Sequence, residues 1–223
     1  MNIVLPFPYM TETVICDMLY KNQPEREHMA KVKWKPGTML SPLPAALISC
    51  GDMDRPNVMT AAWTGIVNSK PPRAYVSIRP ERYSHGLIKE SGVFVINVTT
   101  DRLKYAVDYC GVKSGREEDK FKACALTPQR SFEVECPSVE ESPISLECRV
   151  FKVVELGSHD MFLADIAAVS VDDSLIDEND RLKLEDAGIL SYIHGGYFEQ
   201  GRYAGHFGWS VKKDKNRGKR GQR

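Results

Sequence analysis

The chain has 223 residues, of which 42% are hydrophobic, enough to bury one sizeable core. Its 30 basic residues balance its 30 acidic residues, so the overall charge excludes a chain-wide electrostatic attraction to nucleic acid. The sequence has no signal-peptide pattern and no apolar run long enough to cross a bilayer, and we therefore expect a cytoplasmic protein without membrane contact.

The first segment, residues 1–28, differs in composition from the rest of the chain. A short apolar start is followed by a polar run, whereas the residues from Met29 onward read like the beginning of a folded domain. We predict an N-terminal extension at 1–28 and a domain at 29–211. The extension is a loose arm, an arm packed on a partner subunit, or the product of a seldom-used upstream start codon.

The middle of the chain is rich in predicted strands. Six segments combine β-branched and aromatic residues and are separated by clusters of Gly, Pro, Asn and Asp. The predicted strands lie at 44–50, 58–65, 73–79, 93–98, 145–156 and 161–171. Strands therefore dominate the predicted fold.

Two shorter segments, 82–92 and 101–111, are predicted helices, each with a capping residue near its start and a glycine at its end. The predicted caps are Ser84 and Asp101 at the starts and Gly92 and Gly111 at the ends. Because helices are inserted among more numerous strands, we predict a mainly β fold, a β-barrel with helical insertions, and not a doubly wound sheet.

The last segment, residues 212–223, is predicted to be a basic flexible tail. After Ser210 the chain holds seven basic residues and one acid, with no apolar periodicity to fold it. A tail that grips a polyanion such as nucleic acid is the minor alternative.

The six cysteines are scattered and form no Cys-x-x-Cys pair, which indicates free thiols in a reducing compartment. Cys124, Cys136 and Cys148 succeed one another at intervals of twelve residues, which is not a zinc-ligand spacing, and no histidine pair stands nearby. We expect no metal centre.

The motif search excludes several common sites. No Gly-x-Gly-x-x-Gly follows a strand, and the sequence has neither a Walker-type phosphate loop nor a Gly-x-Ser-x-Gly elbow. A different anion site is suggested by Arg79, Arg82 and Ser84, which join a strand end to a helix start. The alternative is that Ser84 only caps the helix and that the arginines are solvated.

Trp63 stands one predicted strand away from this anion site and comes directly after Ala61 and Ala62. Small residues let a flat ring approach the strand backbone, and the indole adds an apolar wall. Trp63 alone is more often an ordinary core residue. Together with the anion site, it suits a ligand with a planar ring at one end and a phosphate at the other.

Several blocks carry a resemblance to a known family. They are "GTMLSPLPAALISCGD", "NVMTAAWTGIVNSKPPRAYVSIRPERYSHGLI", "GVFVINV", "DYCGVKSGREEDKF", "ELGSHDMFLADI" and "YAGHFGWSVKK". From about residue 29 to residue 212 the chain resembles the flavin reductase-like, FMN-binding split-barrel family, and within it the flavoredoxin branch. The resemblance implies a six-stranded antiparallel split β-barrel with a Greek-key layout, usually a homodimer. FMN then binds non-covalently near the subunit interface.

The resemblance also implies roles for particular residues. The isoalloxazine ring is lined by Thr60, Ala61, Ala62 and Trp63, with Asn68 in a loop that reaches the ring or the ribityl chain. The phosphate and ribityl block is Ser77, Ile78, Arg79, Arg82, Tyr83 and Ser84, with Arg79 and Ser84 favoured for the phosphate.

Further family positions lie later in the chain. Asn97 falls close to the flavin, and Ser114, Gly115 and Lys120 belong to a loop and helix that close over the cofactor. Lys120 on a solvated face is the equally good alternative. The match puts His159 and Asp160 at the flavin edge, where His159 is the candidate catalytic residue, positioning a nicotinamide or shielding the reduced ring. A structural role for this lone histidine is the alternative.

The resemblance implies an FMN-dependent oxidoreductase. It reduces flavin with NADH or NADPH, or carries electrons to a redox partner protein. A non-catalytic flavin- or haem-binding module is the alternative. The chemistry belongs to the flavin, so no protein acid or base is required.

Overall fold

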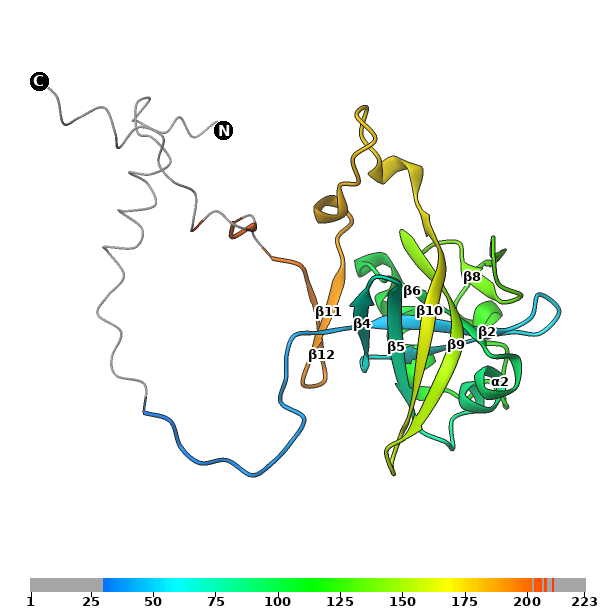
Figure 1. The fold of residues 1–223 in the computed structure, drawn as a ribbon, viewed down its shortest axis with the longest axis horizontal. Helices are drawn as coiled ribbons and strands as arrows, with labels where there is room; N and C mark the ends of the chain where they lie inside the picture. Colours follow the sequence, from blue (N-terminus) through cyan, green and yellow to red (C-terminus); the bar gives the residue numbers. More distant parts are fainter. Residues whose placement is uncertain (1–29, 202, 206, 208–209, 211–223) are drawn as a thin grey trace, which may run out of the picture. The chain divides into compact units, whose positions relative to one another are not determined.

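The computed structural model describes residues 30–201, 203–205, 207 and 210 (Figure 1). The predicted extension at 1–28 and the predicted tail at 212–223 lie outside the described residues. The chain divides into two compact units at Thr38 and Met39. Described residues 30–38 of the first unit contain no helix or strand, and every described helix and strand belongs to the second unit.

The main sheet has seven strands in the order β3-β2-β6-β9-β10-β5-β4. They are β2 (Ala46–Gly51), β3 (Pro56–Ala61), β4 (Thr64–Ser69), β5 (Pro72–Ile78), β6 (Val93–Asn97), β9 (Ile144–Glu155) and β10 (Asp160–Val171). All their pairings are antiparallel. Figure 1 shows the long β9 and β10 side by side across the molecule. The predicted mainly β split barrel is confirmed.

The two edge strands of the main sheet, β3 and β4, are consecutive in the chain. The two residues between them, Ala62 and Trp63, therefore link the two edges of the sheet, and we call this link the seam. The backbone N–H of Ser77 donates to the carbonyl of Trp63 at 2.8 Å and holds the link against β5. The predicted strand at 58–65 is therefore two strands, because the chain leaves β2 and joins β5 within two residues.

The helices are α2 (Tyr83–Ser91), η1 (Asp101–Leu103), α3 (Lys104–Val112) and the single turn α4 (Lys120–Ala123). Both predicted helices exist, and Gly92 ends α2 with a left-handed φ of 71°, as predicted.

The other three predicted caps are wrong. Arg82 is the N-cap of α2, and Ser84 lies inside the helix, where its hydroxyl accepts a hydrogen bond from Asn57. Asp101 lies inside η1 and pairs with Lys104. Gly111 lies within α3, which ends at Val112 with Lys113 as its C-cap; an added Cβ at Gly111 would stand 3.5 Å from Cβ of Thr60 on β3.

Smaller elements complete the fold. β1 (Leu43–Pro44), β11 (Leu190–Ile193) and β12 (Gly196–Glu199) form one sheet, and β7 (Pro128–Arg130) pairs with β8 (Pro137–Val139). Two single turns are η2 (Asp173–Leu175) and η3 (Leu184–Asp186). Within the described residues, the helices are all too short or too polar to cross a membrane.

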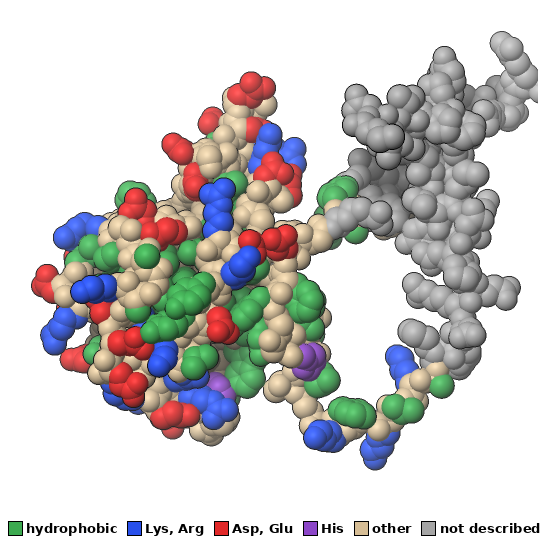
Figure 2. Space-filling model, turned by 180° about the vertical axis from the view of Figure 1, so that it is seen from behind, with side chains coloured by type: hydrophobic (Ala, Val, Ile, Leu, Met, Phe, Trp, Pro, Cys, Tyr) green, Lys and Arg blue, Asp and Glu red, His purple; other side chains and the backbone are tan. Residues whose placement is uncertain are grey.

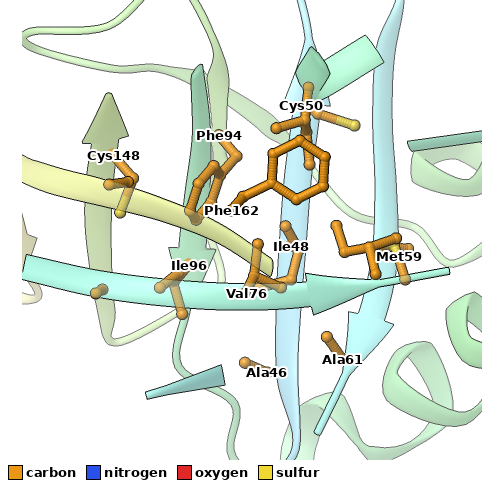
Figure 3. Close-up of a cluster of buried hydrophobic side chains, with 14 residues drawn as sticks. Ala46, Ile48, Cys50, Met59, Ala61, Val76, Phe94, Ile96, Cys148 and Phe162 are labelled. Atoms are coloured by element: carbon orange, nitrogen blue, oxygen red, sulfur yellow. The ribbon is translucent and has the colours of Figure 1, made fainter. Parts of the chain in front are cut away.

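The two larger of three hydrophobic cores among the described residues lie on opposite faces of the main sheet. Successive side chains of a strand point to opposite faces, so Ile48 of β2 packs in the barrel core while Leu47 packs against α3 and α4. Figure 3 shows Phe94 and Phe162 close together in the barrel core, with Ile48 and Val76 beside them. The face of the described residues seen in Figure 2 mixes basic, acidic and hydrophobic side chains.

Candidate functional site

A pocket of about 540 Å³ lies where the end of β5, the start of α2 and the segment from α3 to α4 meet. It brings together seven of the predicted site residues: Arg79, Arg82, Tyr83, Ser84, Ser114, Gly115 and Lys120. Six further lining residues are Met59, Glu81, Cys110, Lys113, Arg116 and Glu117. We call residues 111–123, which supply one side of it, the pocket wall.

The pocket is cationic. Its basic lining residues are Arg79, Arg82, Lys113, Arg116 and Lys120, against the acidic Glu81 and Glu117. The first turn of α2 also opens here, and backbone N–H groups at a helix start carry partial positive charge. Such a surrounding favours an anionic ligand with several oxygen acceptors.

The arginines are held by weak or neutral contacts. Arg79 Nη1 lies 3.6 Å from Glu81 Oε1, and both side chains are more than half exposed, so water screens this ion pair. Arg82 donates to the carbonyl of Gly111 at 3.2 Å, and Arg116 donates to the carbonyl of Glu81 at 3.0 Å. Because carbonyls neutralise no charge, the guanidinium groups remain available to an anion.

Lys120 is the buried cation of the site, with 3% of its surface exposed. Its Nζ donates to the carbonyls of Cys110 (3.4 Å) and Lys113 (3.3 Å), and within the described part of the chain no carboxylate pairs with it. Burial lowers the pKa of this lysine, opposed by the Cys110 and Cys50 thiols. The solvated-face alternative for Lys120 is wrong, and a bound anion would stabilise its charged form.

Ser84 is placed by a buried asparagine. Asn57 Nδ2 donates to Ser84 Oγ at 2.7 Å and contacts Cys50 Sγ at 3.2 Å. Ser84 is 2% exposed and lines the pocket, and its hydroxyl, which also interacts with the Cys50 thiol, can donate to a ligand oxygen there.

Gly115 permits the closest approach in the pocket wall. A Cβ there would lie 2.0 Å from Asn57 Oδ1 and 3.0 Å from Tyr83 Cδ1, so any side chain must displace the asparagine that holds Ser84. Arg116 beside it sets its guanidinium 5.6 Å from the Tyr83 ring centroid.

The residues predicted to line a flavin ring lie outside this pocket. Ala61 is buried in the barrel core, and Thr60 donates to the carbonyl of Val107 on α3. Ala62 is half-buried at the seam beside Trp63, whose indole is 36% exposed. The Trp63 ring packs on His159 with centroids 4.4 Å apart.

His159 therefore contacts Trp63, and the placement of both residues beside a flavin ring stays a prediction. Burial lowers the pKa of His159, the charge of Arg79 lowers it further, and Glu81 opposes them. The neutral imidazole is therefore favoured, with Nδ1 3.0 Å from the Ser158 hydroxyl.

Other predicted positions have roles within the fold. Asn68 is exposed on β4 and donates to Pro71 in the hairpin at 2.7 Å, Ser77 is half-buried on β5, and Ile78 is in the barrel core. Asn97 is fully buried, donating to Leu47 and Ser49 and accepting from Val139 and Ser145. These hydrogen bonds join strands β2 and β6 to β8 and β9.

Behind the pocket, His85 Nε2 lies 2.8 Å from Asp160 Oδ2, and both side chains are buried. This contact ties α2 to β10 and was not predicted, because nothing in the sequence indicates that residues 75 positions apart meet. Lys113, Arg116 and Glu117 were also missed; their signal was the charged run around the predicted Ser114 and Gly115. Within the described residues no three His, Cys, Asp or Glu side chains are grouped to hold a metal ion.

Comparison with known proteins gives consistent matches. The family model described as "Flavin reductase like domain" matches residues 38–201. Among solved structures, the flavoredoxin of Desulfovibrio vulgaris (Miyazaki F) is 31% identical with a TM-score of 0.76, covering 82% of this chain and 100% of that one. The FMN-binding protein of Thermus thermophilus is 28% identical with a TM-score of 0.65, covering 81% and 99%. An uncharacterised protein of Archaeoglobus fulgidus is 41% identical over 138 residues, 62% of this chain and 77% of that protein.

Proposed function

The chain belongs to the flavin reductase-like domain family, and on that premise we propose that it is an oxidoreductase that binds FMN non-covalently and passes electrons through it. The observation that carries this proposal is the cationic pocket of about 540 Å³ with the buried Lys120 and the placed hydroxyl of Ser84. These hydrogen-bond donors and positive charges suit FMN, which carries a dianionic phosphate on a polar ribityl chain. Similarity to a flavoredoxin and to an FMN-binding protein supports it.

The residues present fit the phosphate end of such a ligand. Lys120 and Arg79 supply charge, the start of α2 supplies backbone N–H groups, and Ser84 supplies a hydroxyl donor. Gly115 leaves room for Asn57 to hold that hydroxyl in place. The pocket wall would shield the phosphate from water.

When bound, FMN supplies the hydride- and electron-accepting chemistry. The residues of this chain then hold and orient it. Trp63 and the uncharged His159 form an apolar and polarisable surface for a flat ring, and His159 positions a nicotinamide or shields the ring. The protein residues need transfer no proton for electrons to pass.

The test of FMN binding begins with colour. A yellow protein whose cofactor is released on denaturation and runs as FMN supports the proposal, and a colourless protein that refuses FMN titration contradicts it. The double variant Arg79→Ala/Ser84→Ala should lose FMN while keeping its circular dichroism spectrum. Arg102→Ala, an exposed arginine outside the pocket, is the matched control and should keep FMN.

Two modes of electron transfer remain to be separated, NAD(P)H-dependent flavin reduction and electron carriage to a redox partner. Anaerobic stopped-flow absorbance near 450 nm separates them. Rapid bleaching with NADH or NADPH identifies a reductase, and its absence favours a carrier. A Soret band without a flavin spectrum would instead identify the haem-binding alternative.

A homodimer is the assembly that we propose. Exposed apolar side chains on the strands, among them Ile66, Val67 and Phe151 with 63%, 48% and 45% of their surfaces accessible, would be covered by a second subunit. Sedimentation velocity tests this, since a monomer at micromolar concentration contradicts it. We expect a cytoplasmic location and no nucleic-acid partner.

A further inference from the structure

Cys110 and Cys124 form a close thiol pair at the edge of the pocket, which Cys110 helps to line. Cys110 lies on α3 and Cys124 is the C-cap of α4, and their sulfur atoms are 3.8 Å apart. A disulfide bond is about 2.05 Å long, so the sulfurs must approach by roughly 1.8 Å, which side-chain rotation and a small shift of α4 can provide. Cys50, Cys136 and Cys148 are each buried, with no sulfur–sulfur contact of this kind among the described residues.

The pair stands at the two ends of the pocket wall. The residues between the two cysteines include Lys113, Ser114, Gly115, Arg116, Glu117 and Lys120, all of which line the pocket. Lys120 Nζ already donates to the carbonyl of Cys110. A bond between the sulfurs would close this wall into a covalent ring.

The two thiols differ in access. Cys110 has 1% of its surface exposed, and it lines the pocket. Cys124 is only partly buried, at the edge of the core around α3 and α4. An external reagent therefore meets Cys124 first, and Cys110 is placed to react second.

From this geometry we infer that Cys110 and Cys124 are a modification site, which small-molecule disulfides convert reversibly into an intramolecular disulfide that clamps the pocket wall. The inference deepens the proposed function by adding control of the same pocket, and its chemistry does not depend on FMN.

The reaction balances as two thiol–disulfide exchanges. The Cys124 thiolate attacks one sulfur of a disulfide such as oxidised glutathione, forming a mixed disulfide and releasing one thiolate. The Cys110 thiolate then attacks Cys124 Sγ, forms the Cys110–Cys124 bond and releases the second thiolate. Two protons pass from the cysteines to the released thiolates, and the external disulfide is reduced by two electrons. Dithiothreitol reverses both steps.

The first experiment treats the reduced full-length chain with excess oxidised glutathione and maps the product. Trypsin cuts after Lys104, Lys113, Lys122 and Arg130, so "YAVDYCGVK" and "ACALTPQR" each carry one cysteine of the pair. We expect these two peptides linked, a loss of two hydrogens in the intact mass, and recovery with dithiothreitol. Stable glutathione adducts, or a disulfide between other cysteines, would overturn the inference.

Variants make the assignment specific. Cys124→Ser alters a partly exposed position and should fold normally, yet it should give no linked peptides. Cys148→Ala removes a buried thiol from β9 that lacks a thiol partner in the described structure, and it should form the disulfide as the unchanged protein does. Linked peptides that persist in Cys124→Ser, or that vanish in Cys148→Ala, would contradict the pair.

The clamp is measured without flavin. In the oxidised form, amide hydrogen exchange across residues 111–123 should slow, and Tm should rise by about 6–12 °C, as a ring of this size constrains the unfolded chain. Unchanged exchange and unchanged Tm would show that the wall is not clamped. If FMN binds, its release from the oxidised protein should be slower by about threefold or more. A protein that binds no FMN would sink the proposed function and still leave the mapping, exchange and Tm results decisive here.

Discussion

The barrel core and the pocket wall obtain their order in different ways. The barrel core is a set of antiparallel strands whose side chains, such as Phe94 and Phe162, are buried without charge. The pocket wall is short helices and loop around a buried ammonium, that of Lys120. The order of the barrel core depends on the packing of apolar side chains, and the order of the pocket wall depends on a few polar atoms held in fixed positions. Substitutions that change side-chain volume should therefore lower stability in the barrel core, whereas substitutions that displace polar atoms should weaken ligand binding at the pocket wall.

The largest effect is expected in the barrel. Phe162→Ala removes a fully buried ring that packs against His85, and we expect unfolding to become easier by about 3–5 kcal/mol. Urea denaturation measures this change. Val169→Ala on the same strand, with about half of its side chain exposed, should cost less than about 1 kcal/mol. Equal costs at both positions would remove the distinction between core and surface.

The next effect is expected in the wall. In Gly115→Ala the added Cβ collides with Asn57 Oδ1, so Ser84 loses its holder and FMN affinity should fall by tenfold or more, with a stability cost of about 1–3 kcal/mol. Gly86→Ala is the matched control. Its Cβ meets nothing within 4 Å in α2, and alanine should stabilise that helix by about 0.5–1 kcal/mol. Unaltered FMN binding in Gly115→Ala would show that the wall tolerates displacement.

The rate at which Cys124 is alkylated, measured over a series of pH values, tests how closed the pocket wall is. Burial raises the pKa of this thiol; the Cys110 contact and the charge of Lys120 lower it, while Glu118 raises it. Only the thiolate reacts, so its alkylation by iodoacetamide should be slow at pH 7. The rate should rise about tenfold per pH unit and keep rising above pH 9. A rate that levels off below pH 8 would indicate a low pKa and a more open wall.

The smallest effect concerns backbone strain at the end of the wall. Ala125 comes directly after Cys124 with a φ of 52°, the left-handed region that disfavours alanine. Ala125→Gly should therefore raise the free energy of unfolding by about 1 kcal/mol. Thermal denaturation would detect it as a higher Tm, and a lower Tm would show that the Ala125 side chain contributes packing that exceeds the strain.

The barrel strands could be predicted from sequence because burial imposes a short apolar period on each of them. The segments at 73–79, 93–98, 145–156 and 161–171 correspond to β5, β6, β9 and β10. The break at Ala62 and Trp63 could not be predicted, because it depends on which partner each half pairs with, and pairing is a long-range property.

The pocket was predicted in part. Arg79, Arg82 and Ser84 carried a local signal at a strand end and a helix start, and the resemblance added Gly115 and Lys120. The sequence does not encode locally the contact of Asn57 with Ser84, which joins residues 27 positions apart. Assignments of Thr60, Asn68 and Asn97 to the flavin stay predictions.

The seam at Ala62 and Trp63 restricts where residues can be inserted into the chain. Its two residues connect both edges of the main sheet, and the Trp63 carbonyl accepts a hydrogen bond from the backbone N–H of Ser77. One inserted residue would reverse which side chains of β4 face inward, because strand side chains alternate. The loop at 177–183, which joins no two strands of the main sheet, lacks this restriction. Longer variants of this chain should accordingly carry their extra residues in the loop at 177–183 and keep two residues between β3 and β4.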